Sequence, residues 1–458
     1  MSSLLSLLNV ARDGIIAQSG ALQVTGENVS NANTPGYVRR SAILQTRALG
    51  SSNGTVEFAG IRRNFDRFVY GRVLDESGKY GAANARAKEL GSIEQMVAPE
   101  QGGVREALTG FFSALNALST NPKDRTSRSL VLQKSEELAQ NISQTAAGLA
   151  QSRTDLLGKA QGVAAEVNDR LGKIAELNQK IAAAQAMGEP AADLRDSREV
   201  LVRDVSDRMG ARAIEDEAGN ISLFAGGAAL VTGNTASTVQ VDLDPAGAMR
   251  VQVPRPGGAA IDITTQVNSG SLGGLREVRD VDVVAAQNGL DKLAFDLANS
   301  LNAVHSTGVG LDGVSGRNLF EAPLAVAGAA YAFKVDASVA GAPDNIGASA
   351  NAADLPGGGQ VALLLAQLAQ APLAGGGTPS ERVGSWLGDV GIRKSAADSE
   401  TSVREGTVAQ AQALHDSSTG VSVDEEMVDL TRYQRAFEAS TRVLRAADEL
   451  LSNLIKEL

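Results

Sequence analysis

Apolar residues at seven-residue spacing mark the first helix that the sequence predicts. The members of this stripe are Leu4, Leu8, Ile15, Leu22 and Val29. The pattern indicates an amphipathic helix over residues 3–30. Three glycines weaken the helix by roughly 1 kcal/mol each relative to alanine, and an isolated helix of this kind is marginal in water. It must therefore gain stability by packing against another element.

A second stripe with the same spacing lies at the other end of the chain. Its members are Leu430, Phe437, Leu444, Leu451 and Leu458. Ser422 and Glu425 have capping-box spacing and predict the start of this helix. The strict spacing favours a coiled-coil seam, with a simple core helix as the alternative. The positions predicted to face the seam are polar: Gln434, Thr441 and Asp448. We expect both stripes, together with Met427, to form an assembly interface.

A turn is predicted where the first helix ends. Asn31, Asn33 and Gly36 accumulate there, and Thr34 is pushed toward extended geometry because it precedes Pro35. Proline presets φ and glycine supplies a positive φ, so this dipeptide is typical of a turn.

Between the two ends, helical patterns predominate. Residues 38–75 are predicted as extended, with short strands at 42–46 and 55–61. Apolar residues at steps of three and four predict long helices over 105–208, which are typical of an elongated bundle. Further helices are predicted at 275–305, 363–368 and 378–414.

Two segments depart from the helical pattern. Alternation around a turn at 244–247 indicates a β-hairpin and a small inserted β domain over residues 211–270. Residues 306–356 are rich in Gly, Ala and Asp, and we expect loops there. One strand is predicted in that segment, on the alternating residues Tyr331, Phe333 and Val335.

Composition narrows the possible functions. Asp and Glu number 53 against 42 Lys and Arg, and the net charge is −11. Nucleic-acid binding is disfavoured, because phosphate neutralisation needs clustered cations. The chain has no Cys, which excludes disulfides and thiolate metal sites. We expect no Sec-type signal peptide, because residues 1–10 lack a basic segment and the apolar run is broken by Ser6, Asn9, Arg12 and Asp13. We expect no membrane insertion, because no apolar run approaches about 20 residues.

The search for catalytic chemistry gives no positive candidate. His305 and His415 lack metal-ligand partners at three or four residues, and each is interpreted as a surface or helix-end histidine. Residues 308–313 fit G-x-G-x-x-G, but a helix precedes them and a loop follows, so the dinucleotide interpretation is rejected. The acidic pairs Asp193/Asp196 and Asp280/Asp282 are interpreted as solvated helix faces. No catalytic, metal or cofactor site is expected.

Both ends carry motifs that resemble one protein family. The N-terminal motif comprises Asn28, Ser30, Asn31, Ala32, Asn33, Thr34, Pro35, Gly36 and Tyr37. The C-terminal motif includes Tyr433, Ala436, Phe437, Asp448, Glu449 and Leu450. Together they resemble the terminal signatures of bacterial flagellar rod, hook and hook-associated proteins. Residues 193–202 and 272–280 look like the hook-associated members, and hook proteins differ by a middle that is mainly β.

The resemblance implies a mainly α fold with inserted β and nested, discontinuous domains. The expected domains are an inner terminal coiled coil (1–35 plus 424–458), an elongated mainly helical domain (36–210 plus 271–423, with a small β element near 318–355) and an outer β domain (211–270).

The resemblance also implies a structural role. Such a protein is exported unfolded by the flagellar type III apparatus, assembles outside the cell at the hook tip and joins hook to filament. Its implied partners are hook protein, a second junction protein, further copies in a helical homo-oligomer, and an export chaperone on the C-terminal helix. The alternatives are a hook or distal-rod protein, or a flagellum-exported enzyme or adhesin with a central active module.

Overall fold

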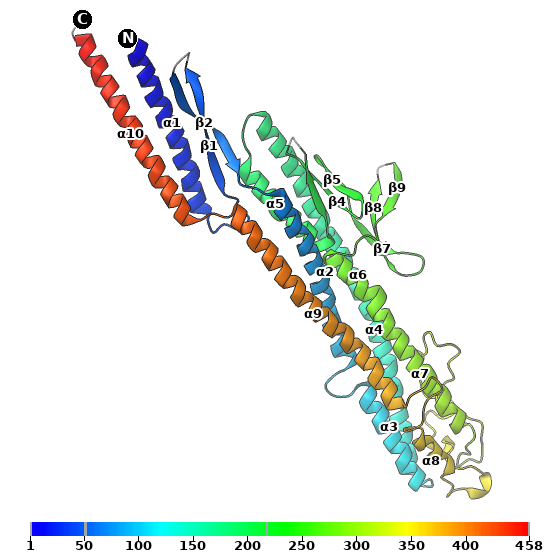
Figure 1. Ribbon diagram of the computed structural model, residues 1–458. Coiled ribbons are helices and arrows are strands. Elements are labelled where there is room, and N and C mark those ends of the chain that lie inside the picture. Colours follow the sequence, from blue (N-terminus) through cyan, green and yellow to red (C-terminus); the bar gives the residue numbers. More distant parts are fainter. Residues whose placement is uncertain (1, 50–52, 217–218, 256, 457–458) are drawn as a thin grey trace.

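The computed structural model describes residues 2–49, 53–216, 219–255 and 257–456, and it shows an elongated rod (Figure 1). Both chain ends lie at one end of the rod. The prediction of a mainly α chain with inserted β structure is confirmed. Within the described ranges, no helix combines the length and the apolar character needed to cross a bilayer.

The central part of the rod is a bundle of long helices. Its members are α2 (Arg67–Val97), α3 (Gly103–Thr120), α4 (Arg125–Ala186), α5 (Ala192–Met209), α6 (Gly270–Glu277), α7 (Val283–His305), α8 (Gln360–Gln367) and α9 (Pro379–Thr419). Side chains cap several helix starts: Asp124 accepts from the backbone N–H groups of Thr126 and Ser127, and Thr378 forms a capping box with Glu381.

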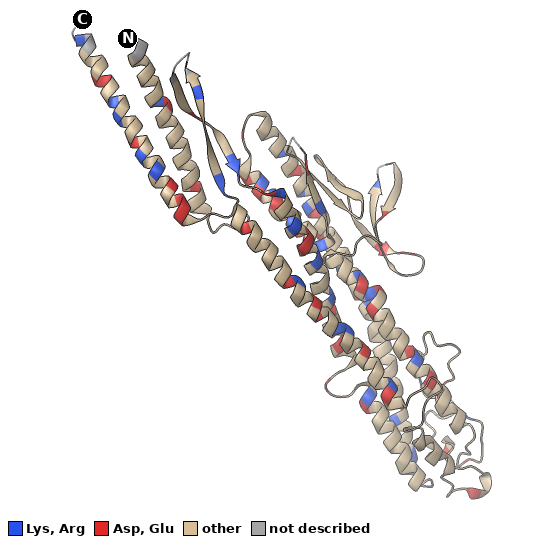
Figure 2. Ribbon diagram, viewed as in Figure 1, with Lys and Arg blue, Asp and Glu red and all other residues tan. Residues whose placement is uncertain are grey.

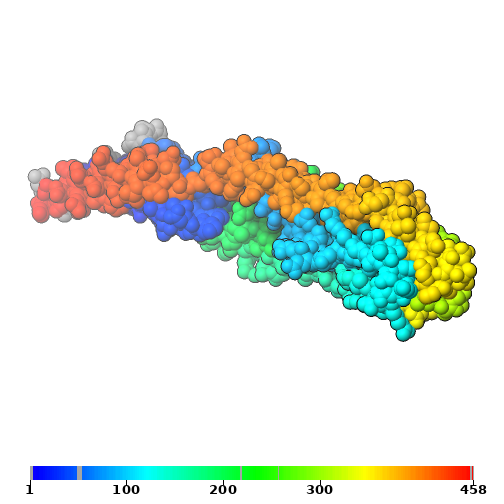
Figure 3. Space-filling view, turned by 90° about the horizontal axis from the view of Figure 1, so that it is seen from below, coloured from blue at the N-terminus to red at the C-terminus, as the bar shows by residue number. Residues whose placement is uncertain are grey.

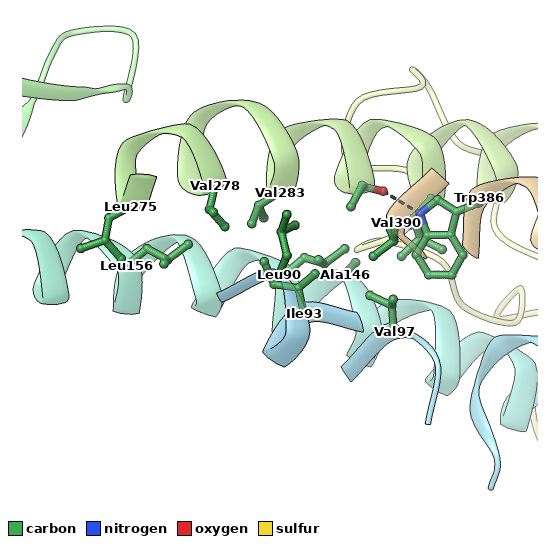
Figure 4. Close-up of a cluster of buried hydrophobic side chains, with 14 of the residues drawn as sticks. Leu90, Ile93, Val97, Ala146, Leu156, Leu275, Val278, Val283, Trp386 and Val390 are labelled. Atoms are coloured by element: carbon green, nitrogen blue, oxygen red, sulfur yellow. Dashed lines mark hydrogen bonds between the residues drawn. The ribbon is translucent and has the colours of Figure 1, made fainter. Parts of the chain in front are cut away.

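Aliphatic side chains fill the bundle core (Figure 4). Leu90 of α2, Leu156 of α4 and Val283 of α7 are fully buried. The only tryptophan, Trp386 of α9, lies beside Val390 at one end of this cluster and donates its indole N–H to the Ala286 carbonyl at 2.9 Å. The core is therefore continuous through the bundle and needs few aromatic rings.

A π-helical segment, Val278–Asp282, joins α6 to α7. It carries Asp282, whose side chain is fully buried and pairs with Arg86 of α2 at 2.9 Å and Arg393 of α9 at 3.0 Å. The interpretation of Asp280 and Asp282 as a solvated face is therefore wrong for Asp282. Its carboxylate instead ties three helices together.

Two small antiparallel sheets lie on the side of α4. One has the order β3 (Arg212–Glu215), β4 (Ile221–Ala225), β5 (Ala228–Thr232), β6 (Thr235–Ala236), and the other has β7 (Gln240–Leu243), β8 (Met249–Arg255), β9 (Gly258–Asp262). The predicted hairpin is confirmed as β7–β8, with Gln240 opposite Gln252. Asn168 of α4 anchors the second sheet by bonds to both backbone groups of Val239.

The strand expected around Phe333 is wrong. Residues 306–356 form turns and loops with two short 3-10 helices, Pro343–Asn345 and Ala352–Asp354, and with isolated bridges, one of which joins Phe320 to Val335. Phe333 is buried, and its ring packs against the Phe320 ring with the centroids 4.7 Å apart and the planes tilted by 30°. His305, at the end of α7, is buried and not on the surface: its Nδ1 lies 2.8 Å from the Arg317 carbonyl, and its Nε2 accepts from Gly347 N–H.

The terminal part of the rod contains α1 (Ser2–Asn31), β1 (Arg40–Leu49), β2 (Asn53–Arg63) and α10 (Val423–Lys456). The α1 helix runs antiparallel to α10 on one side and contacts the β1–β2 hairpin on another (Figure 1). The predicted strands at 42–46 and 55–61 exist but are longer. The extended segment ends earlier than predicted, because Asp66 caps α2 by accepting from the N–H groups of Phe68 and Val69.

Candidate assembly site at the paired termini

Small residues form the contact between α1 and its two neighbours. A Cβ at Gly14 would lie 2.9 Å from the Ser440 Oγ of α10, and one at Gly20 would lie 2.8 Å from the Phe58 ring of β2. Ala17 and Ala21, on the same helix, have no exposed surface. These small side chains let α10 and the hairpin approach the α1 backbone closely.

The predicted α1 stripe borders this contact and does not form its centre. Each of its members is half-buried: Leu4, Leu8, Ile15, Leu22 and Val29. The fully buried positions are the neighbouring small or short side chains, including Ala11 and Val24. The leucines therefore have part of their apolar surface free for other contacts.

On α10 the predicted stripe faces α1 along its length. Four members are half-buried: Leu430, Phe437, Leu444 and Leu451. Met427 is exposed, and Leu458 lies outside the described residues. The second half of the seam is formed by Tyr433, Ser440 and the fully buried Ala447. The polar residues predicted to face the seam do not all do so, because Gln434 and Asp448 are exposed.

The signature turn after α1 docks on the bundle. Gly36 has φ +82°, and a Cβ there would lie 2.5 Å from Val200 of α5. Tyr37 is half-buried, and the guanidinium of Arg40 lies 4.7 Å from the centre of its ring. Burial raises the pKa of the Tyr37 hydroxyl to about 12, against the opposing effect of Arg40. The phenol is therefore a neutral hydrogen-bond donor throughout the physiological range.

The other signature residues divide between the turn and the helix surfaces. Asn31, Ala32 and Ala436 are half-buried. The exposed members are Ser30, Asn33, Thr34, Pro35, Asp448, Glu449 and Leu450. Their side chains are free to contact other molecules.

Asn28 is the polar centre of the site, and only 1% of its surface is exposed. Its Nδ2 donates to the Arg40 carbonyl at 2.7 Å and to Glu426 Oε2 at 2.9 Å. Its Oδ1 accepts from the Arg40 backbone N–H at 3.0 Å and from the Tyr37 hydroxyl at 2.9 Å. One side chain thus links α1, the signature turn, β1 and α10.

Glu426 closes the site from α10 and is itself buried. Its Oε1 accepts from Arg39 Nε at 2.7 Å. The same arginine donates to the exposed Glu425 at 2.9 Å. In Figure 2 the acidic residues at the start of α10 lie beside this corner of the rod. Besides complementing the positive helix N-terminus, these carboxylates therefore neutralise a cation of the turn.

Ion pairs join the terminal part to α5. Arg40 contacts Asp193 and lies 3.1 Å from Asp196. Arg63, at the end of β2, pairs with the same Asp196 at 2.6 Å and with Glu199 at 2.9 Å. The interpretation of Asp193 and Asp196 as a solvated face is therefore wrong for Asp196, which is buried between two arginines.

These charged partners could not be found from local sequence patterns, because Arg40 and Asp196 are far apart in the chain. The available signal was the charge density of residues 193–202, one of the stretches that resemble the hook-associated members. The arrangement can hold two parts of a rod at a fixed angle. In the described ranges, no cluster of three or more His, Asp or Glu is suited to a metal ion.

Large apolar side chains remain exposed on both terminal helices. They include Leu5, Leu7 and Ile16 on α1 and Met427, Val428, Val443 and Leu450 on α10. The outward face of α10 is open along its length in the space-filling view (Figure 3). Apolar surface of this extent on paired helices is typical of a protein–protein contact.

Comparisons with known proteins match both ends and the middle of the chain. Residues 8–37 match the family described as "Flagella basal body rod protein", and residues 412–457 match "Flagellar basal body rod FlgEFG protein C-terminal". Two such ends, paired as antiparallel helices, define a flagellar protein of the rod and hook class. Residues 90–320, half of the chain, match "Flagellar hook-associated protein FlgK helical domain". The chain belongs to the FlgK family of flagellar hook-associated proteins, which confirms the resemblance seen in the sequence.

Two relatives show how far the similarity extends. Flagellar hook-associated protein 1 of Salmonella typhimurium is 28% identical over 327 residues, covering 69% of this chain and 59% of that protein. The protein of the same name from Bacillus subtilis is 24% identical over 500 residues, covering 99% and 98%. The chain thus spans 59% of the length of the Salmonella relative.

A solved structure is also similar, that of the flagellar hook junction protein FlgK from Burkholderia pseudomallei. It is 23% identical with a TM-score of 0.49, covering 56% of this chain and 46% of that chain.

Proposed function

We propose that this protein is a structural adaptor that joins the flagellar hook to the filament. The observation that carries the proposal is a FlgK-family chain whose two ends pair while leaving apolar faces exposed on α1 and α10. Those faces are suited to be buried by neighbouring subunits in a tube. The partners we propose are hook protein, a second junction protein and further copies of this chain.

We propose that successive parts of the rod occupy successive layers of the assembly, from the inside outward. The paired termini, residues 1–35 and 424–458, form the inner element, and we count the β1–β2 hairpin with them because it contacts α1. Residues 36–210 and 271–423 form the next layer outward. The sheets of residues 211–270 project from the side of α4 and face solvent.

The composition of the chain and the exposed face of α10 are consistent with export. We propose that the subunit leaves the cell unfolded through the flagellar type III apparatus and acts outside it. The absence of Cys is compatible with this route, because stray thiols are a liability in an oxidising environment. The exposed apolar face of α10 is the proposed contact for an export chaperone, in a helix-on-helix mode.

Other functions have less support. A hook or distal-rod role is weakened by the helical middle and its match to the FlgK helical domain. An exported enzyme or adhesin would need an active module in residues 211–270 or 306–375, and no catalytic set was found there in the sequence. We therefore propose a role without catalysis.

A strain that lacks the protein tests the proposal. We expect electron microscopy to show hooks without filaments, and flagellin to be lost to the medium. Normal filaments in that strain would refute the adaptor role.

A matched pair of variants tests the proposed surface. Val428 on α10 and Val403 on α9 are 69% and 67% exposed. Val428→Asp should fail to restore filaments, because it places a charge in the proposed contact, whereas Val403→Asp should restore them. Equal complementation by both variants would exclude this face of α10 from the assembly.

A further inference from the structure

The apolar contacts between α1 and α10 repeat along the helices. On α10 the seam residue is leucine or phenylalanine at every seventh position from Leu430 to Leu451. On α1, a step of seven residues leads from Gly14 to Ala21, two small residues. A slide of one heptad, about 10 Å at 1.5 Å per residue, would keep leucine or phenylalanine along that line of α10 and would place Ala447 against Gly14 in place of Ser440. Such a contact specifies its register weakly.

Two contacts nevertheless report one common register. Gly14 lies against Ser440, and Asn28 bonds to Glu426. In an antiparallel pair, a move of fourteen residues toward the C-terminus of α1 corresponds to a move of fourteen residues toward the N-terminus of α10. Asn28 lies fourteen residues after Gly14, and Glu426 lies fourteen residues before Ser440, so the two contacts belong to one register. The second contact is polar and has no equivalent one heptad away, where Tyr433 occupies the corresponding α10 position.

The link between the bundle and α10 limits sliding in one direction only. Residues 420–422 separate α9 from α10, and three residues cannot supply a further 10 Å. A slide toward the corner is open, because the first turns of α10 can unwind into the link. That slide would bring Tyr433 to Asn28. Its single hydroxyl cannot replace a carboxylate that accepts from both Asn28 and Arg39.

We infer that Glu426 is the residue that fixes the register of the terminal helix pair. Only 2% of its surface is exposed, and both of its oxygens are bonded in the observed register alone. Its position parallels that of a single buried polar residue that specifies register in a coiled coil. A chain that refolds after export would need such a device, because a slipped pair would displace every outward residue of α10.

The absence of Cys allows a direct test on the purified full chain. Gly14→Cys/Ser440→Cys reports the observed register, since a Cβ at position 14 lies 3.5 Å from the Ser440 Cβ, within the range of a disulfide. Ala21→Cys/Ser440→Cys reports the slipped register. Each pair is placed in four backgrounds: unchanged, Glu426→Gln, Glu426→Leu and the exposed neighbour Glu425→Leu. Disulfide yield is read by peptide mass spectrometry under mild oxidation.

We expect the 14–440 disulfide alone in the unchanged, Glu426→Gln and Glu425→Leu chains, because glutamine still accepts from Asn28. In Glu426→Leu the ratio of 21–440 to 14–440 product should rise about tenfold or more, the factor that a bond to a charged group contributes. A Glu426→Leu chain that forms only the 14–440 disulfide would overturn the inference. Loss of both disulfides would overturn it too, because Glu426 would then be required for pairing itself. Filament assembly is not measured, so failure here is distinct from failure of the proposed function.

Discussion

Replacing Asn28 by alanine is the sharpest test of the terminal site. The substitution removes four hydrogen bonds, to the two backbone groups of Arg40, to the Tyr37 hydroxyl and to Glu426. Arg40 and Glu426 are buried, so water cannot readily replace the lost partner. At about 1 kcal/mol net for each bond, and more where a buried group is left unpaired, we expect a loss of roughly 4 kcal/mol.

Two further asparagines in the same motif provide graded controls. Asn31 donates to the Glu27 carbonyl at 3.0 Å and accepts from the Thr34 hydroxyl at 3.2 Å, in partly exposed surroundings. Its replacement by alanine should cost about 1 kcal/mol. Asn33 is exposed, and its replacement should change the free energy of unfolding by less than about 0.5 kcal/mol.

Hydrogen exchange followed by mass spectrometry measures these differences locally. A loss of roughly 4 kcal/mol corresponds to about a thousandfold faster exchange in α1 and α10 peptides, or to complete loss of protection if the helices have less to lose. Peptides from α4 should be unaffected. The reasoning would be refuted if Asn28→Ala changed α1 exchange no more than Asn31→Ala did.

Three further predictions concern packing, a buried histidine and a buried carboxylate. Gly20→Ala should destabilise the protein by about 1–3 kcal/mol, because the added methyl group would press on the Phe58 ring of the hairpin. Gly26→Ala should stabilise α1 by up to about 1 kcal/mol, because the space around Gly26 is open. Thermal melts should show opposite shifts for the two variants. Burial lowers the pKa of His305, so as the pH falls the unfolded chain binds a proton at this residue before the folded chain does. The free energy of unfolding should therefore fall as the pH drops below about 6.5. Urea midpoints should show this fall in the unchanged chain and not in His305→Gln. Asp282→Asn should cost about 3–5 kcal/mol in urea unfolding, because it removes the charge partner of two arginines, whereas the exposed Asp389→Asn should be neutral.

The sequence could predict elements whose signal is local. The helix starts at Ser422 and Thr378 and the β7–β8 hairpin follow from residues a few positions apart. The exact face of α1 could not be predicted, because burial there depends on two neighbours at once. Leu8 satisfies the heptad, yet the closest approach falls at Gly14 and Gly20, where small size and not hydrophobicity decides the contact.

Long-range charge pairing explains why the candidate site was only partly predicted. The family motif includes Asn28 and Tyr37, but Glu426, Arg63 and Asp196 were not identified as members of the site. An acidic residue on a helix is exposed in most proteins. Only the fold brings an arginine from β2 to Asp196 and so permits its burial.

The ion pairs at the corner of the rod also bear on how the subunit carries load. Arg40 has three carboxylates within reach, on Glu27, Asp193 and Asp196. We expect a small rotation of the terminal helices against α5 to keep Arg40 within reach of at least one of these carboxylates. Pulling the terminal helices away from α5 would break the contacts of Arg40 with Asp193 and Asp196 together. The corner is therefore expected to be stiff against separation and compliant in torsion.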